Sequence, residues 1–402
     1  MSFKTMPSSV YLLAICQALM MSGTTLLITA SALVCYTLTE DKALTTLPLS
    51  LQFLGLMLTS IPASLIMGRW GRKAGFMLGG LFGIAGGTVL VLATLNHQFW
   101  WFAFGSFLIG IFNGFGTYYR FAAVDMVDVE NRPKAISYVM VGGVIAALIG
   151  PNLASFGSEL FSGEQFAGGF VFMTIFYVMI FAIMSFMRLP NAASAKQESS
   201  GRPLKEILKQ PAFFVAVLCG MLGYGVMSYV MTATPLAMQH HGHVFDETAF
   251  VIQWHVLAMF VPSFFTGSII QRFGALNVMI VGAVLGLACM LINLFGTSVW
   301  HFWLALVALG ISWNFLFIGA STYLTYSYQA EEKAKAQAFN DFAVFTMVTI
   351  ASLSAGFFQH KFGWRVVNIG VIPFIGIILV SIFWLKSLPE GKRVSSKAER
   401  RV

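Results

Sequence analysis

Charged side chains are scarce in this sequence. Asp, Glu, Lys and Arg together make up 10% of its 402 residues, whereas soluble globular proteins carry about 25%. Hydrophobic residues make up 57%, and the mean hydropathy is +0.79. These values exclude a soluble globular protein. They predict that most of the chain lies in a lipid bilayer as helices, because backbone polar groups in lipid must be satisfied within the protein.

Cysteine and recognisable catalytic motifs are scarce as well. The four cysteines lie in apolar runs without the spacing of a metal site or a disulfide framework, so we expect them to be packing residues. They are Cys16, Cys35, Cys219 and Cys289. The sequence also lacks a Gly-rich phosphate-binding loop with its Lys, and it shows no convergent nucleophile and base. We therefore expect neither an ATP-driven pump nor a membrane-embedded enzyme, and no cofactor or resident metal.

Long apolar runs are what the sequence has in abundance. About 20 such residues span the hydrocarbon core as a helix. Twelve runs can be marked: Tyr11–Tyr36, Leu47–Met67, Ala74–Leu95, Gln98–Val124, Ala135–Phe156, Ala167–Met187, Ala212–Met238, Ala249–Ile270, Asn277–Phe295, Val299–Ser327, Ala336–Phe358 and Val366–Leu385. The first is too long for a signal-peptide core, so we interpret it as an uncleaved spanning helix. The fold class predicted is an all-α membrane protein with twelve transmembrane helices.

The arrangement of these runs predicts two pseudo-symmetric six-helix bundles. We assign residues 1–188 to the first bundle and 211–388 to the second. Residues 189–210 contain prolines, small residues and cations, which is typical of a cytoplasmic linker, and its apolar positions indicate a short surface helix. Residues 389–402 are predicted to form a basic cytoplasmic tail.

The net charge of +8 could indicate a nucleic-acid partner, but the distribution of the cations indicates a membrane topology instead. If the N-terminus is cytoplasmic, three of the 24 Lys and Arg residues fall in outer loops, Arg120 lies inside a helix, and the other twenty are cytoplasmic. This is the positive-inside bias. We therefore expect a bacterial inner-membrane protein with both termini in the cytoplasm.

A short polar segment at the end of the second run, Ser64–Lys73, has a counterpart at Gly267–Ala275 in the second half of the chain. It resembles the loop signature of the major facilitator superfamily, Gly-x-Leu-Ala-Asp-Arg-x-Gly-Arg-Lys. Gly68 and Gln271 stand at the acidic position, so neither half keeps the acid of the family's charge lock. The residues that carry the resemblance are Arg69, Gly71, Arg72 and Lys73, echoed by Arg272 and Gly274.

Two further segments extend the resemblance. Gly110–Gly116 is similar to the family's helix-4 pattern Arg-x-x-Gln-Gly-x-Gly, with Gly110 at the Arg position. Gly150 and Pro151 belong to a loosened form of the helix-5 signature of antiporters, although small residues at this spacing also serve close helix packing. The resemblance implies a monomeric secondary transporter that works by alternating access, closest in motif style to bacterial proton-coupled drug and metabolite antiporters.

In this superfamily helices 1, 4, 7 and 10 line a central cavity. Aromatic and thioether walls with a few amides suit an amphipathic organic molecule, although each residue could instead pack against a neighbouring helix. The resemblance places seven residues near the substrate: Gln17, Asn113, Tyr118, Tyr119, Tyr229, Trp313 and Asn314.

Ionisable residues within the runs are candidates for coupling and gating, because buried charges in a membrane usually face a cavity or a partner. Arg120 and Asp341 lie at matching depths near the cytoplasmic ends of their helices, and we expect them to pair across the two bundles. The alternative for Arg120 is an interaction with Asp125 or Asp128. His255 could accept a proton from the outer side, or it could be a neutral histidine bonded to a neighbouring helix.

Three clustered histidines, His240, His241 and His243, lie in a predicted outer loop. They leave metal binding open, although such clusters are more often bystanders. The function predicted is secondary active transport of a small amphipathic organic molecule, with protons and the lipid bilayer as partners. The helix-5 motif favours proton-coupled efflux. The alternative is proton-coupled import of a nutrient, a vitamin or a metal chelate; a non-transporting receptor would not explain the duplication.

Overall fold

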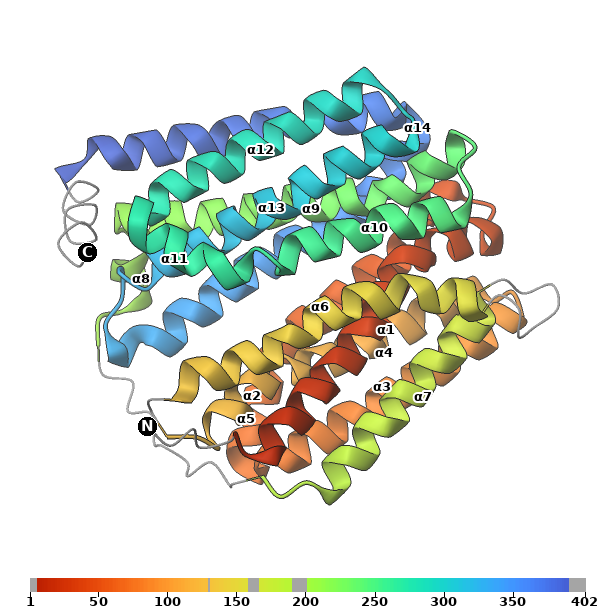
Figure 1. The fold of residues 1–402 in the computed structure, drawn as a ribbon, viewed down its shortest axis with the longest axis horizontal. Coiled ribbons are helices and arrows are strands. Elements are labelled where there is room, and N and C mark those ends of the chain that lie inside the picture. The colour runs from red at the N-terminus through yellow and green to blue at the C-terminus, as the bar shows by residue number, and fades with distance from the viewer. Residues whose placement is uncertain (1–5, 129–130, 158–165, 190–200, 390–402) are drawn as a thin grey trace. The chain divides into compact units, whose positions relative to one another are not determined.

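In the computed structural model, the described residues are 6–128, 131–157, 166–189 and 201–389, and every regular element among them is helical. Residues 190–200 of the predicted linker and 390–402 of the predicted tail lie outside this set. The chain divides into two compact units, Met1–Lys196 and Gln197–Val402, and the division falls within the predicted linker. The colours of Figure 1 follow the first unit from red to yellow-green and the second from green to blue.

The first unit contains seven α-helices and one short 3-10 helix in its described part. They are α1 (Ser8–Leu38), η1 (Lys42–Leu44), α2 (Leu47–Trp70), α3 (Arg72–Leu95), α4 (Phe99–Gly116), α5 (Tyr119–Val124), α6 (Arg132–Gly157) and α7 (Ala167–Phe186). In this unit α1 packs on α6, α2 packs on α4, and α3 packs on both α4 and α7.

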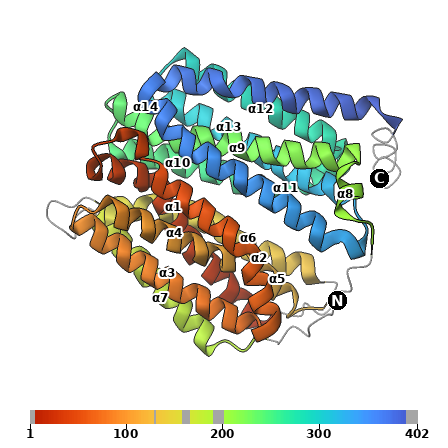
Figure 2. The same ribbon diagram turned by 180° about the vertical axis from the view of Figure 1, so that it is seen from behind.

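The second unit begins with a short helix that leads into the long ones. Its elements are α8 (Leu204–Leu208), α9 (Pro211–His240), α10 (Phe245–Phe260), α11 (Ser263–Phe273), α12 (Ala275–Phe295), α13 (Val299–Leu324), η3 (Ala330–Glu332) and α14 (Lys333–Ser387). Here α9 packs on α13 and α14, and α13 packs on α10 and α12. Figures 1 and 2 show the C-terminal part of α14 beside α12.

All twelve expected runs lie in helices, which together form the all-α fold predicted. Ten helices of the described residues are individually long and apolar enough to span a membrane. The pair α10 and α11, bent by 44°, makes one further span. Helix α14 has 55 residues and is interrupted by non-helical backbone at Gly363, so it contains the last two runs. A straight helix of that length would extend about 80 Å, more than twice the hydrocarbon thickness.

Two of the expected straight helices are broken. The run Ala249–Ile270 bends between α10 and α11, where Pro262 stands at the N-cap of α11. Proline lacks the backbone N–H needed to continue the hydrogen-bond ladder, which accounts for the bend. The run Gln98–Val124 is divided into α4 and α5 by a turn at Thr117 and Tyr118.

Gly71 and Gly274 occupy equivalent turns in the two units. Each ends one helix and caps the next, with φ of 85° and 81° respectively. An L side chain is strained in this left-handed region, and glycine is not. The repeated glycine in the two loop segments therefore has the same conformational cause in both halves.

Candidate substrate-binding and gating residues

One close helix contact in each unit is built in the same way. A Cβ atom on Gly110 of α4 would collide with the carbonyl oxygen of Gln52 of α2. A Cβ atom on Gly310 of α13 would lie 2.6 Å from the carbonyl oxygen of His255 of α10. These glycines let backbone pack on backbone. Gln52 and His255 are thus structural counterparts, and both are buried.

His255 is held by a hydrogen bond across this contact. Its Nδ1 lies 2.8 Å from the carbonyl oxygen of Leu306 on α13. A carbonyl can only accept, so Nδ1 carries the proton and Nε2 is an acceptor in the neutral ring. Nε2 is buried and has no hydrogen-bond partner among the described residues. This hydrogen bond to a neighbouring helix agrees with the alternative in which His255 has a structural role. The role of His255 in proton coupling stays a prediction.

The two asparagines expected near the substrate have different partners. Asn113 of α4 exchanges hydrogen bonds with Thr24 of α1, at 3.0 and 3.3 Å. Asn314 of α13 is fully buried. Its Nδ2 donates to the Met259 carbonyl and the Ser263 hydroxyl, and its Oδ1 accepts from Thr266. The Asn314 amide therefore holds the bent pair α10 and α11 against α13.

The tyrosines that begin α5 lie in two different environments. Tyr118, at the N-cap of α5, donates its hydroxyl to the carbonyl oxygen of Ser60 on α2, at 2.8 Å. Tyr119 is buried and packs against Phe76 of α3, with ring centroids 4.8 Å apart. Gln17 is half-buried on α1, where its Cγ would touch a Cβ added to Gly142 of α6.

An aromatic cluster in the second unit is formed by side chains from four of its helices. We define it by Tyr224 of α9, Phe260 of α10, Trp313 and Phe317 of α13, and Phe345 of α14. Trp313 and Phe317 are stacked, with centroids 5.1 Å apart and an interplanar angle of 8°. Tyr224 meets both rings edge-on, at 5.3 and 5.5 Å. The other two rings lie at the margin, Phe260 6.1 Å from Trp313 and Phe345 6.2 Å from Tyr224.

The helices that carry this cluster also carry buried polar atoms without a hydrogen-bond partner among the described residues. The indole N–H of Trp313 is buried, and so are the hydroxyls of Ser228 and Thr232 on α9 and of Ser352 on α14. None of these four atoms has a hydrogen-bond partner among the described residues. A buried donor without a partner costs free energy, and indole N–H groups usually find a partner when buried. The Trp313 N–H therefore offers hydrogen-bonding capacity at the edge of a flat aromatic ring, and α9 and α14 carry three further hydroxyls that are unpartnered within the described ranges.

The two predicted gate residues belong to different units, and each makes contacts within its own unit. Arg120 is exposed in the first unit and lies over the ring of Phe121, at 4.9 Å. Asp341 is exposed in the second unit, and its carboxylate accepts a hydrogen bond from Asn340 at 3.1 Å. The pairing of Arg120 with Asp341 stays a prediction.

The histidines between α9 and α10 are joined to protein groups. The two ring nitrogens of His243 lie 3.2 Å from the Glu247 carboxylate and 2.7 Å from the Thr297 carbonyl. His241 Nδ1 bonds the carbonyl of Ala237. Within the described ranges, no group of three or more His, Cys, Asp or Glu side chains is arranged to hold a metal ion.

Comparison with known proteins establishes the family. The family model described as Major Facilitator Superfamily matches residues 13–261 and 227–402. The chain belongs to the major facilitator superfamily. It is 40% identical over 385 residues to the riboflavin transporter RfnT of Brucella anthropi, covering 95% of this chain and 96% of that protein. It is also 26% identical over 353 residues to an uncharacterized MFS-type transporter of Bacillus subtilis, YddS, with coverage of 82% and 81%.

Solved transporters of the superfamily share the fold at low sequence identity. A D-xylose-proton symporter matches with a TM-score of 0.75 and 14% identity, covering 96% of this chain and 99% of that one. A bacterial homolog of the human lysosomal transporter Spinster matches with a TM-score of 0.71 and 17% identity, covering 94% and 96%. The chain is therefore an integral membrane transporter with the superfamily fold, and its relatives are transporters rather than enzymes.

The superfamily loop signature makes contacts despite its missing acid. Arg72 Nε lies 2.6 Å from the carboxylate of Asp125, at the end of α5, and Lys73 Nζ donates to the carbonyl of Ser185 on α7. Asp125, one of the alternative partners of Arg120, is therefore bound to Arg72. In the second unit, Arg272 is exposed over the Phe273 ring.

Packing accounts for one departure from the superfamily patterns and for one glycine that is retained. At Gly110, where the pattern has Arg, any side chain would collide with the Gln52 carbonyl. In the helix-5 segment, a Cβ atom on Gly150 of α6 would lie 2.6 and 2.7 Å from Thr25 and Ser22 of α1. Gly150 therefore lets α6 approach α1 closely, as the packing alternative for this segment requires.

The expected site residues did not include most of the aromatic cluster. Phe260, Phe317 and Phe345 were not singled out, whereas Tyr229, which was expected near the substrate, packs near Phe358, with centroids 6.3 Å apart. The spacing of Trp313 and Phe317, four residues apart and so on one helix face, was the available signal.

Proposed function

We propose that this transporter carries riboflavin or a closely related flavin by alternating access. The observation that carries the proposal is the aromatic cluster around Trp313, whose buried indole N–H has no hydrogen-bond partner among the described residues. The 40% identical relative is a riboflavin transporter, matched over nearly its full length. Riboflavin consists of a flat three-ring isoalloxazine and a polyhydroxylated chain, so its binding site needs both flat apolar surface and hydrogen-bonding groups.

The cluster meets both needs. The parallel faces of Trp313 and Phe317 favour stacking of a planar ring, as aromatic pairs prefer offset-stacked or edge-on contacts. The Trp313 N–H could then donate to a ring carbonyl or ring nitrogen. The hydroxyls of Ser228 and Thr232, one and two turns beyond Tyr224 on α9, would serve the polar parts of the molecule.

Import is the direction that we propose. Efflux was expected from the helix-5 motif, but the close contact of Gly150 with α1 also fits the packing alternative for that motif, so we give the motif less weight than the riboflavin-transporter relative. Riboflavin is a vitamin, and vitamin import was the alternative left open by the sequence. We further propose that protons drive transport, with Asp341 and His255 as titrating groups, and that the termini face the cytoplasm of a bacterial inner membrane.

The proposal is tested by uptake of radiolabelled riboflavin into proteoliposomes under an imposed inward proton gradient. Saturable uptake that unlabelled riboflavin blocks, and that dissipation of the gradient lowers, is the expected result. Failure to move flavin in either direction would overturn the substrate. If the inward proton gradient instead drives riboflavin out of preloaded proteoliposomes, import is overturned and efflux is favoured. If the rate of uptake is the same with and without the proton gradient, proton coupling is overturned.

A further inference from the structure

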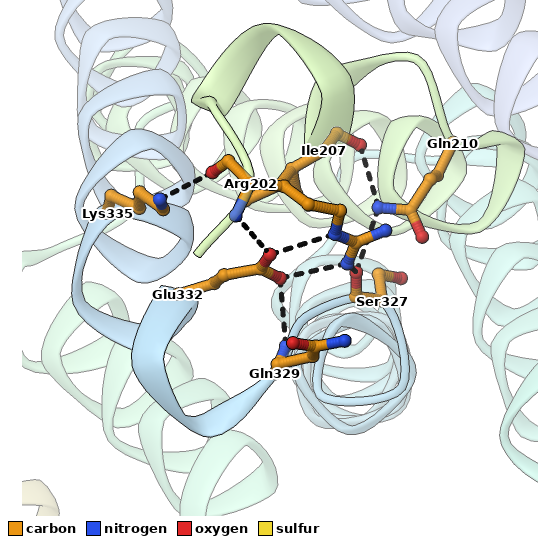
Figure 3. Close-up of polar contacts among 7 residues, drawn as sticks. All are labelled: Arg202, Ile207, Gln210, Ser327, Gln329, Glu332 and Lys335. Carbon is orange, nitrogen blue, oxygen red and sulfur yellow. Dashed lines mark hydrogen bonds and ion pairs between the residues drawn. The ribbon is translucent and has the colours of Figure 1, made fainter. Parts of the chain in front are cut away.

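A buried carboxylate lies at the start of α14, outside the aromatic cluster and the predicted gate. Glu332 is 0% exposed and accepts four hydrogen bonds, drawn in Figure 3. Three come from Arg202, whose backbone N and side-chain Nε bond Oε1 at 2.9 and 2.8 Å, and whose Nη2 bonds Oε2 at 2.8 Å. The fourth comes from the backbone N of Gln329, at 3.0 Å. Each carboxylate oxygen therefore has two donors, which suits a buried anion.

The chain around Arg202 is shaped to enclose this carboxylate. Gly201 has a φ of 121°, and a Cβ atom on it would lie 2.9 Å from Cγ of Glu332, so a side chain at this position would be both strained and crowded. Lys335 Nζ donates to the carbonyl of Arg202 from the first turn of α14 (Figure 3). Residues 201 and 202 thus bind Glu332 on one side and are bound by Lys335 on the other.

The segment that follows Arg202 is attached at two further points. Ile207 of α8 is fully buried. Gln210, the residue before α9, donates to the carbonyl of Ser327, three residues beyond α13, at 3.0 Å. We call the contacts of Arg202, Glu332, Lys335, Gln210 and Ser327 the clamp.

The charge state of the clamp is stable. Hydrogen bonds from Arg202, followed by those from backbone N–H groups, lower the pKa of Glu332 to about 2. The same hydrogen bond raises the pKa of Arg202 above its ordinary value. Both partners therefore stay ionised over the whole physiological range, and pH does not open the clamp.

The clamp ties together the ends of three helices: Gln210 leads into α9, Ser327 follows α13, and Glu332 leads into α14. These helices carry Tyr224, Trp313, Phe317 and Phe345 of the aromatic cluster. We infer that the clamp makes α9, α13, α14 and the end of the linker move as one body during transport. It transmits the movement of this body to the linker, so its loss slows the conformational step and leaves substrate binding nearly unchanged.

Limited trypsin digestion of the purified full chain tests the clamp without any substrate. Trypsin cleaves after Lys and Arg but not before Pro, so it spares the Arg202–Pro203 bond and reports on Lys205 and Lys209, which have exposed side chains. We expect Glu332→Gln to raise the cleavage rate at these lysines at least about tenfold, because α8 is released. Glu331→Gln is the matched control. It removes the same charge from the neighbouring residue, whose side chain is exposed.

A second set of variants separates the clamp from general misfolding. Arg202→Gln leaves a buried carboxylate without its cation and should be at least as damaging as Glu332→Gln, whereas the double variant Arg202→Gln/Glu332→Gln should be milder than Arg202→Gln alone. Each variant is compared at equal monodispersity by size-exclusion chromatography. The clamp would be overturned if both single variants were cleaved at the wild-type rate. It would also be overturned if Glu331→Gln raised the cleavage rate as much as Glu332→Gln does.

The transport arm of this inference rests on the proposed function. For Glu332→Gln we expect the maximal rate of riboflavin uptake to fall about tenfold while KM changes by less than about twofold. A rise in KM at an unchanged maximal rate would overturn the role in movement. If the wild-type protein moves no riboflavin, the proposed function fails, and the trypsin result still decides whether the clamp exists.

Discussion

Gln52 of α2 and His255 of α10 occupy equivalent places in the two units, each with its backbone carbonyl against a glycine of a neighbouring helix. The glycines are Gly110 and Gly310, at the points where α4 packs on α2 and α13 packs on α10. The two halves therefore share a packing contact as well as a loop motif. They differ in the side chain placed there, an amide in one half and a titratable imidazole in the other.

The shared contact predicts that neither glycine tolerates even a methyl group. In Gly110→Ala and Gly310→Ala the new Cβ would approach a backbone carbonyl, which cannot move without shifting its helix. Overpacking of this kind costs about 1–3 kcal/mol, so both variants should unfold at a lower temperature in a thermal-shift measurement. Gly370→Ala in α14, where a Cβ meets no atom within 4 Å, is the control and should melt like wild type. Equal melting of all three variants would contradict the packing contact.

If His255 couples transport to protons, a substitution there should abolish proton coupling without affecting riboflavin binding. His255→Gln gives the second unit the residue type that Gln52 supplies in the first, and it keeps a hydrogen-bonding side chain that cannot titrate. If His255 accepts the coupling proton, this variant should lose uptake driven by a pH gradient and still bind riboflavin with wild-type affinity. A wild-type pH profile together with normal accumulation would show that His255 serves only to bond Leu306. The coupling role would then fall to Asp341.

The predicted gate is tested by a double-mutant cycle on Arg120 and Asp341. If the two side chains pair during the cycle, Arg120→Ala and Asp341→Ala should each lower uptake strongly, and the double variant should be less impaired than the sum of the two effects. Strictly additive losses of uptake rate would exclude the pair. Glu331→Ala serves as a control for the loss of an exposed acid that is not a proposed partner of Arg120.

The ion pair of Glu332 predicts how stability depends on pH. Its folded pKa of about 2 lies below the ordinary value of 4.5, so ionised Glu332 stabilises the fold fully above about pH 4.5. That contribution is lost as the pH falls through the folded pKa. The difference in melting temperature between wild type and Glu332→Gln should therefore be the same at pH 6 and pH 8. A difference that disappears between these two values would contradict the assigned ionisation.

The sequence predicted the helices better than it predicted their faces. The length of each apolar run is enough to predict a membrane-spanning helix. Pro262 could also have predicted the bend in the run Ala249–Ile270, because it lies at that bend. The turn at Thr117 and Tyr118 carries no comparable signal. The aromatic cluster draws Tyr224, Trp313 and Phe345 from three helices, and which face each helix presents depends on packing. Arg202 and Glu332 are 130 residues apart, and neither differs from other charges of the predicted cytoplasmic segments until the fold brings them together.

The most direct test of a flavin site at the aromatic cluster is equilibrium binding of riboflavin to the purified protein, followed by quenching of flavin fluorescence. Stacking on an aromatic ring quenches a flavin, so wild-type protein should give a saturable decrease. Trp313→Leu should weaken binding at least about tenfold, since it removes both the stacking surface and the indole donor. Trp300→Leu makes the same change on the same helix at a side chain that is 69% exposed, and it should bind like wild type. Wild-type affinity in Trp313→Leu, or no saturable binding by the wild-type protein, would contradict the account.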